Sequence, residues 1–433
     1  MVESRVKSAW LTMFHASAAR VSRLFVVLSI VIAVIGVNLI SLTAANADAF
    51  WTNAIEMPGL ATLNQTVAAP GQIVCTSNGN CVSGGSYTDG SVSQQAFLSQ
   101  ETNGVWSSAT VIAQALNVGG AAQVMAISCP AAASCTAVGF YSDLAGARHT
   151  FVISQVNGTW GFPTEVPDFT PLKVHDASEM STLSCTTNTT CVGVGTYLEN
   201  SAGLAEPILF SETNGVWATP VEAPGSTSFN PSGLAVVDLL ACPSTTTCVA
   251  SGVIVVLSPL SIEPFLITET NGVWGSLEAV PGASALSRQN IAVVESLSCG
   301  APGDCTAVGE YTDTAGGSQA FVINEVAGVW GSASQLLASQ ILGSGLSNSL
   351  TGVACPSAGN CTAIGSFADA QGNPQPFVVD ESNHAWSPAV ALTGMQASTT
   401  ARAPTPRRFR VVRSAHAVPA VPITTRVITP RCS

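Results

Sequence analysis

Six pairs of cysteines with the spacing C-x5-C recur along this chain at almost constant intervals. The first cysteines of successive pairs are 54, 56, 57, 57 and 56 residues apart, and a tryptophan follows each second cysteine by 25 or 26 residues. A period this regular indicates one supersecondary unit repeated six times. The pairs are Cys75 and Cys81, Cys129 and Cys135, Cys185 and Cys191, Cys242 and Cys248, Cys299 and Cys305, and Cys355 and Cys361.

The fifth copy illustrates the unit. Its β-branched and apolar runs predict strands over 291–299, 305–311 and 320–326, and a fourth strand starting at 329. The turn before the fourth strand is Asn-Gly in four other copies, which suits a type I′ hairpin because both central residues need positive φ. Each unit is therefore predicted to be four antiparallel strands.

The third strand of the unit, for example Ala320-Phe321-Val322-Ile323, is apolar on both faces. Such a strand needs cover on both sides, which radially stacked sheets provide. The sequence thus predicts an all-β fold, a β-propeller of six four-stranded blades over 48–398, in preference to a linear solenoid. Phe50-Trp51 matches the start of a fourth strand. One strand is then surplus, so either one copy is displaced or a seventh blade is incomplete.

The cysteine pairs are expected to form six disulfides that fix hairpin register. Two cysteines six residues apart across a short turn are close enough to bond, and regular pairing is typical of exported proteins. Metal binding is disfavoured, because the whole chain has five His and pairs on different blades lie far apart. No P-loop, dinucleotide fingerprint or zinc-binding helix is present, so neither metal nor cofactor is expected.

The two ends of the chain differ from the repeats. Residues 1–47 have a basic flank, an apolar run from Leu24 and the sequence Ala45-Asn46-Ala47, which predicts a signal peptide or, alternatively, an uncleaved signal anchor. Both place the body outside the cytoplasm, secreted or at the cell surface. Residues 399–433 hold seven Arg, no acid and the unpaired Cys432. They are interpreted as a disordered tail, an envelope tether, or the product of a shifted reading frame.

Charge excludes one class of partner. Residues 48–398 contain 3 basic residues against 25 acidic ones. A body this acidic repels phosphate backbones, so nucleic-acid binding is not expected.

In outline the chain resembles secreted bacterial β-propellers of the kelch and sialidase-like kind. The resemblance covers about 48–398 and depends on the C-x5-C-x-x-[VIS]-G core, the Tyr/Phe-x-Asp turn and the Asn-Gly-x-Trp hairpin. The kelch double glycine and the WD dipeptide are missing, and the sialidase Asp box is matched poorly at Tyr311-Thr312-Asp313. The likeness therefore implies a fold and no catalytic residues.

Topology predicts where a ligand binds. The loops between strands two and three share one face with the connections between blades, and all three basic residues of the body fall in these segments. That loop face is the candidate binding surface, with a carbohydrate or envelope polymer as its expected ligand. The candidate residues are Arg148, His149, Lys173, His175, Asp176, Glu179 and Arg288.

Two other repeated features are assigned structural roles. A Glu or Gln precedes each hairpin turn and is expected on a solvated blade edge: Glu101, Gln155, Glu212, Glu269, Glu325 and Glu381. Aspartates in the loop between strands two and three are expected to bond their own backbone: Asp89, Asp143, Asp313 and Asp369.

The sequence favours a non-catalytic extracellular binding propeller. One alternative is a carbohydrate-active enzyme, a glycoside hydrolase or lyase, using carboxylates at the channel mouth. The carboxylates available for it are Asp176, Glu179, Asp238 and Glu295. A purely structural envelope protein is the other alternative.

Peptide mapping under non-reducing conditions tests the architecture on protein exported from its native host. We expect six disulfides within repeats, an N-terminus at Asp48 and a C-terminus at Ser433. Free thiols in the repeats would contradict the predicted compartment.

Overall fold

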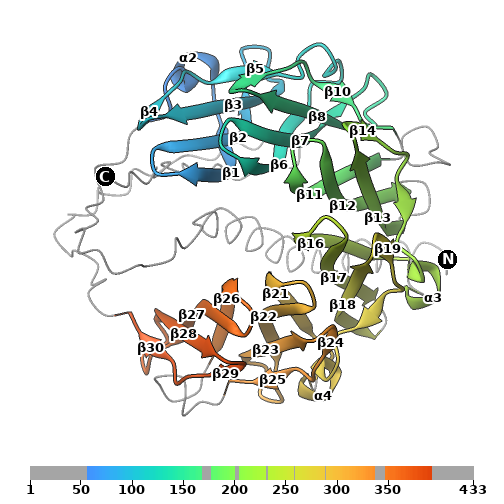
Figure 1. Cartoon of the computed structure of the whole chain (residues 1–433), viewed down its shortest axis with the longest axis vertical. Coiled ribbons are helices and arrows are strands. Elements are labelled where there is room, and N and C mark those ends of the chain that lie inside the picture. The colour runs from blue at the N-terminus through green and yellow to red at the C-terminus, as the bar shows by residue number, and fades with distance from the viewer. Residues whose placement is uncertain are drawn as a thin grey trace, which may run out of the picture.

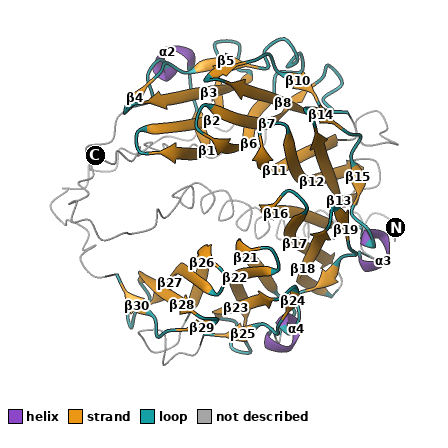
Figure 2. Cartoon of the chain, viewed as in Figure 1, coloured by secondary structure: helices purple, strands orange, loops and turns teal. Residues whose placement is uncertain are grey.

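A computed structural model describes residues 56–167, 177–199, 204–230, 233–257, 259–287, 289–336 and 347–392. These residues form six antiparallel sheets, one for each cysteine pair, arranged around a central axis (Figure 1). Within these ranges, helix is confined to three single turns, shown in purple in Figure 2. The all-β class and the repeated unit are thus confirmed, and a radial array of such sheets is the architecture of a β-propeller.

Each repeat supplies one sheet. The first contains β1 (Ala68–Ser77), β2 (Asn80–Thr88), β3 (Gln94–Thr102), β4 (Val105–Trp106) and β5 (Thr110–Ile112). The second contains β6 (Ala122–Ala131), β7 (Ser134–Ser142), β8 (Arg148–Val156), β9 (Thr159–Trp160) and β10 (Thr164–Glu165). The third contains β11 (Ala177–Thr187), β12 (Thr190–Glu199), β13 (Leu204–Thr213), β14 (Val216–Trp217) and β15 (Val221–Glu222).

The later repeats follow the same plan. The fourth sheet contains β16 (Ala235–Ser244), β17 (Thr247–Leu257), β18 (Leu260–Thr270), β19 (Val273–Trp274) and β20 (Glu278–Ala279). The fifth contains β21 (Ala292–Ala301), β22 (Asp304–Thr312), β23 (Ser318–Val326), β24 (Val329–Trp330) and β25 (Ser334–Gln335). The sixth contains β26 (Asn348–Ser357), β27 (Asn360–Ala368), β28 (Pro374–Ser382), β29 (Ala385–Trp386) and β30 (Val390–Ala391). The helical turns are α2 (Leu60–Leu63), α3 (Ser226–Phe229) and α4 (Ala283–Leu286).

The first strand of each sheet lies innermost and the fourth outermost (Figure 1). The fourth strand is interrupted, so that both of its pieces, such as β4 and β5, pair with the third strand. Innermost strands contact one another in chain order, β1 with β6 and onward to β21 with β26. The sequence order of the repeats is therefore their order around the axis.

A β-bulge in each innermost strand explains the glycine four residues after each second cysteine. In the fifth sheet the bulge lies between Val294 and Ser296, opposite Gly309. A Cβ on Gly309 would lie 2.0 Å from the carbonyl oxygen of Val293, and the matching glycines of the other sheets have similarly short contacts. Bulges bend and twist a strand, and this one leaves no room for a side chain opposite it.

All six predicted disulfides are present, which confirms the pairing expected from the sequence. Each joins the ends of the first two strands of one sheet, with Cα atoms 3.9 to 4.1 Å apart. The six bonds indicate an oxidising environment. Cys75 is bonded to Cys81, Cys129 to Cys135, Cys185 to Cys191, Cys242 to Cys248, Cys299 to Cys305, and Cys355 to Cys361.

The second cysteine of each pair is the more deeply packed of the two. It begins the second strand, where a neighbouring sheet covers it, so the disulfide belongs to the core as well as to the turn. The buried second cysteines are Cys81, Cys135, Cys191, Cys248, Cys305 and Cys361. Their sequence spacing predicted the bonds but gave no indication of this burial. They are structural residues and not part of the candidate binding surface.

The end of each sheet near its disulfide is built the same way in every repeat. The backbone N–H of the second residue in the turn before the fourth strand donates to a carbonyl in the turn between strands one and two, at 2.8 to 3.0 Å. Gly104 donates to Gly79, Gly158 to Ala133, Gly215 to Thr189, Gly272 to Thr246, Gly328 to Gly303, and His384 to Gly359. We call this end the hairpin face.

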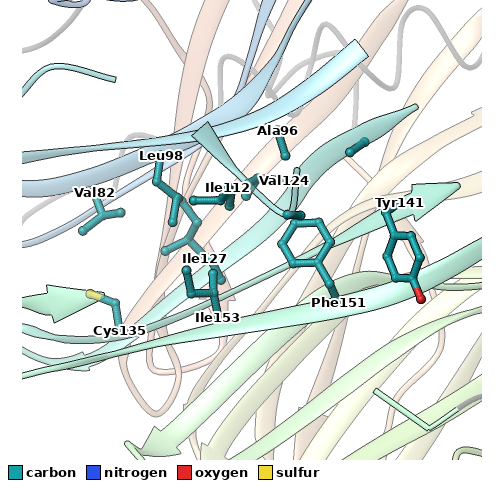
Figure 3. Packing of buried hydrophobic residues seen from close by; sticks show 13 residues of the cluster. Val82, Ala96, Leu98, Ile112, Val124, Ile127, Cys135, Tyr141, Phe151 and Ile153 are labelled. Atoms are coloured by element: carbon teal, nitrogen blue, oxygen red, sulfur yellow. The ribbon is translucent and has the colours of Figure 1, made fainter. Parts of the chain in front are cut away.

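Apolar side chains fill the space between neighbouring sheets. Figure 3 shows Leu98 and Ile112 of the first sheet packed with Phe151 and Ile153 of the second. The third-strand phenylalanine is fully buried in five sheets, and Ile208 takes its place in the third. Burial of both faces of the third strand agrees with its sequence pattern.

The repeated Glu or Gln before the fourth-strand turn is buried, which corrects the prediction of a solvated edge. These six side chains are between 1% and 7% exposed. Two of them bond to the preceding sheet: Gln155 donates to Gln100 of the first sheet at 2.6 Å, and Glu381 accepts from Asn324 of the fifth. The prediction was wrong because polarity alone does not show on which side of a strand a neighbouring sheet lies.

Residues 56–64 lie against the first sheet as the connections of later repeats lie against theirs. The Ala109 amide donates to the Pro58 carbonyl at 2.8 Å, as Leu277 does to Pro224 and Ala333 to Pro281. Met57 and Leu60 pack against Tyr87 and Phe97. The described chain therefore begins in the position of a connection from a preceding unit.

Among the described residues, no helix combines the length and hydropathy needed to cross a bilayer. The apolar run from Leu24 lies outside them.

Replacing Gly309 with Ala is expected to destabilise the protein by more than about 3 kcal/mol, because the new methyl group has no space beside the Val293 carbonyl. Thermal unfolding measures the change. Gly331→Ala is the matched control, since its Cβ would make an ordinary 3.4 Å contact. Equal melting temperatures for the two variants would contradict the steric explanation.

Candidate functional site

The loop face, opposite the hairpin face, carries a repeated polar network. Asp313 Oδ1 accepts from the amides of Ala315 and Gly317 at 2.8 and 2.9 Å, and its Oδ2 accepts from Gln319 at 3.0 Å. The hydrogen bond from the Gly317 amide is the main cause that lowers the pKa of the Asp313 carboxyl. Asp89 and Asp369 accept equivalent bonds. Asp143 accepts from the Ala147 amide at 2.9 Å, so the predicted self-capping turns are confirmed at all four positions.

Connections between sheets attach to the same network. Asn348 donates to the side chain of Gln319 at 2.8 Å and accepts from the Ala320 amide at 2.7 Å. Asn117 makes the matching bond to Gln95 in the first sheet. In the first and fifth sheets the loop is thus held by a turn aspartate, a third-strand glutamine and an asparagine, which is Asn117 in the following connection or Asn348 at the start of β26.

The second sheet departs from this pattern at His149, which occupies the position of Gln95, Gln319 and Gln375. Its Nε2 lies 3.6 Å from Asp143 Oδ2, and its Nδ1 lies 3.9 Å from Glu165 Oε1. The ring stacks on Tyr141 with 5.4 Å between centroids. His149 therefore serves the turn as the glutamines do, while adding a titratable group to the loop face.

Arg148 is held by two contacts. Its Nη1 lies 3.0 Å from Glu179 Oε1, a residue of the third sheet, and its guanidinium carbon lies 4.3 Å from the centre of the Phe140 ring. The Arg148 side chain remains 46% exposed. It is both a bridge between two sheets and a positive group accessible from solvent.

Three of the seven candidate residues are described, and of these the structure brings Arg148 and Glu179 into contact, while His149 contacts Asp143, Glu165 and Tyr141. The other four, Lys173, His175, Asp176 and Arg288, lie outside the described residues. The connection that contains Lys173 to Asp176 follows Val166 and enters β11 at Ala177, close in sequence to Glu179.

A second group of carboxylates lies on the innermost strands of the fourth and fifth sheets. Asp238 and Glu295 occupy the bulge position of β16 and β21. Burial raises the pKa of Asp238 to about 7. Burial, followed by the charges of Glu310 and Asp238, raises the pKa of Glu295 to about 7. Both groups therefore titrate near neutrality, which suits proton transfer.

A groove of about 540 Å³, at which the sequence predicted no site, lies at the outer rim between the first and second sheets. Its lining includes Leu98, Gln100, Ile112 and Trp160. The groove lies beside the fourth-strand turn and so away from the loop face. The sequence offers one indication of this groove: Leu98 and Gln100 are two residues apart in the third strand, so their side chains lie on the same side of the sheet.

Taken together, the radial four-stranded sheets, their hairpin disulfides and their capped loops define a β-propeller-type repeat protein. No family model matches the sequence, and no curated protein matches it.

Several solved structures are similar to the chain. One is a protein of unknown function from Dyadobacter fermentans, at 10% identity and a TM-score of 0.39, covering 76% of this chain and 98% of that one. Another is a GH74 xyloglucanase from Xanthomonas campestris, at 12% identity and 0.43, covering 78% and 46%. A third is an α-L-arabinanase from Penicillium chrysogenum, at 8% identity and 0.38, covering 77% and 98%. The chain thus spans less than half of the xyloglucanase, and no activity is transferred from any of them.

Asp238→Asn is expected to lower the pKa of Glu295, because it removes a like charge that favours the protonated form. Titration of the carboxyl ¹³C resonances measures this shift. Glu179→Gln on the loop face serves as control and is expected to leave Glu295 unchanged. An unaltered Glu295 titration in Asp238→Asn would show that the two carboxylates do not interact.

Proposed function

We propose that this protein is a non-catalytic binding propeller that acts outside the cytoplasm and takes its ligand on the loop face. The observation that carries the proposal is the contrast between the two faces. On the hairpin face, the same backbone hydrogen bond recurs in all six sheets. On the loop face, connections differ from sheet to sheet, with helical turns α3 and α4 after the third and fourth sheets and none in the described part of the second connection.

The chemistry of the loop face supports an anionic or hydroxyl-rich ligand. All three basic residues of an otherwise acidic body, Arg148, Lys173 and Arg288, belong to its segments. The contacts of Arg148 with Glu179 and Phe140 hold the guanidinium in a fixed direction while leaving it partly exposed. A carbohydrate or charged envelope polymer presents the acceptors that such a group binds.

Export and ring closure belong to the same proposal. We infer that residues 1–47 direct export, as a cleaved signal peptide or as an anchor, and that 399–433 form a tail outside the propeller. Residues 56–64 already occupy a connection position against the first sheet. This supports a ring in which Phe50-Trp51 supply a fourth strand at a position between the sixth and first sheets.

A second candidate function is carbohydrate cleavage, and Asp238 with Glu295 favours it. Two neighbouring carboxyls that titrate near pH 7 suit a general acid and base. Release of reducing ends from polygalacturonate and a neutral β-glucan, compared between the native protein and Asp238→Asn/Glu295→Gln, tests this. Activity that the double variant loses would replace the binding proposal with an enzymatic one.

Replacing Arg148, Lys173 and Arg288 together with Ala is expected to weaken binding of polygalacturonate at least tenfold, because the face loses all of its positive charges. Isothermal titration calorimetry measures the affinity.

Alanine at three exposed valines of the fourth strands, Val105, Val216 and Val273, is the matched control and is expected to bind normally. Unchanged affinity in the triple basic variant would remove the loop face as the binding surface.

A further inference from the structure

One side chain in every sheet is buried just before the fourth-strand turn, and in the second and sixth sheets it bonds to a side chain of the preceding sheet. Five sheets have glutamate at this position and the second has Gln155. We call the set Glu101, Gln155, Glu212, Glu269, Glu325 and Glu381 the interface column. None of its members is more than 7% exposed.

The surroundings of the column offer little to a negative charge. Each member pairs across the sheet with a fourth-strand tryptophan, as Glu325 does with Trp330. Within the described residues, one oxygen of each of Glu212, Glu269 and Glu325 is buried and has no hydrogen-bond donor. A buried carboxylate lacking partners costs far more free energy than the neutral acid.

The charged groups near the column do not compensate for this burial. For Glu212 and Glu269, burial is the cause that raises the pKa. Burial is also the main cause that raises the pKa of Glu325, and the like charge of Asp304 raises it further. Burial is also the main cause that raises the pKa of Glu381. Hydrogen bonds from Asn324 and Thr306 and the charge of His384 lower this pKa, and the charge of Asp304 raises it. Ionisation is thus disfavoured at Glu212, Glu269, Glu325 and Glu381, and at the first three no donor opposes the effect of burial.

Gln155 shows what the interface accepts. It is the least exposed member and donates to Gln100 of the first sheet. A neutral side chain of the same length therefore fits this position in the same fold. The protonated form of the five glutamates is nearly isosteric with it and likewise neutral.

We propose that the interface column makes packing between the sheets depend on pH, so that the array of sheets is tightest in mildly acidic surroundings and loosens as Glu212, Glu269, Glu325 and Glu381 ionise. The sign follows from linkage: groups that hold protons more firmly in the folded state stabilise it fully below their unfolded pKa. That stability is lost as the pH rises through their folded pKa. Because the acids are distributed over the array of sheets, the effect involves several interfaces at once.

The test uses the full chain with two opposite variants. Glu212→Gln/Glu269→Gln/Glu325→Gln removes three ionisable members, and Gln155→Glu adds a sixth. Hydrogen exchange of third-strand amides, corrected for intrinsic exchange, is measured from pH 5 to pH 8 together with the melting temperature.

In the native protein we expect corrected exchange to rise at least tenfold across this range. The rise should be clearly smaller in the triple variant and larger in Gln155→Glu. Asp238→Asn/Glu295→Gln measures separately the contribution of the innermost carboxylates. Equal pH dependence in the native protein, the triple variant and Gln155→Glu would overturn the proposal, and Gln155→Glu keeps it testable if the triple variant fails to fold.

Discussion

The sheets are apolar on both sides of their third strands, so they need cover on each side; the second to fifth sheets have a neighbouring sheet on both sides, and Met57 and Leu60 cover Phe97 of the first. This requirement follows from the third strand, whose phenylalanine is fully buried in five of the six repeats while the alternate residues, such as Leu98, pack against the next sheet. Apolar burial at about 25 cal/mol per Å² makes these interfaces the main source of stability. The arrangement around an axis, the bulges of the innermost strands and the buried column all serve this packing.

The two faces of the array respond to that requirement differently. The hairpin face repeats one backbone bond and one disulfide in each sheet, which leaves little freedom for variation. The loop face keeps its turns by side-chain bonds from Asp, Gln and Asn, so that residues can be exchanged without altering the backbone. His149 illustrates this freedom, because it takes the place of a glutamine and remains within 3.6 Å of the turn aspartate. A binding protein needs a surface whose side chains can vary while its backbone stays the same.

Much of the fold could be predicted from the sequence, because a 56-residue period with fixed cysteine and tryptophan positions leaves few arrangements. The strands, disulfides and aspartate turns followed from local chemistry. The burial of Glu325 and its equivalents did not, since a repeated glutamate looks the same on a solvated edge and in an interface. Asp238 and Glu295 were among the carboxylates expected at the channel mouth, but their burial could not be predicted, because it depends on the bulges of β16 and β21. Lys173, His175, Asp176 and Arg288 stay predictions.

The disulfides have a mechanical consequence. Each one joins two strands of the same sheet across six positions of sequence, so none of the six links one sheet to another. No disulfide therefore resists a force that separates one sheet from its neighbour, and only non-covalent packing holds the sheets side by side. Under tension we expect the sheets to separate one at a time. The first two strands of each separated sheet would stay linked by their disulfide, which favours refolding of that sheet.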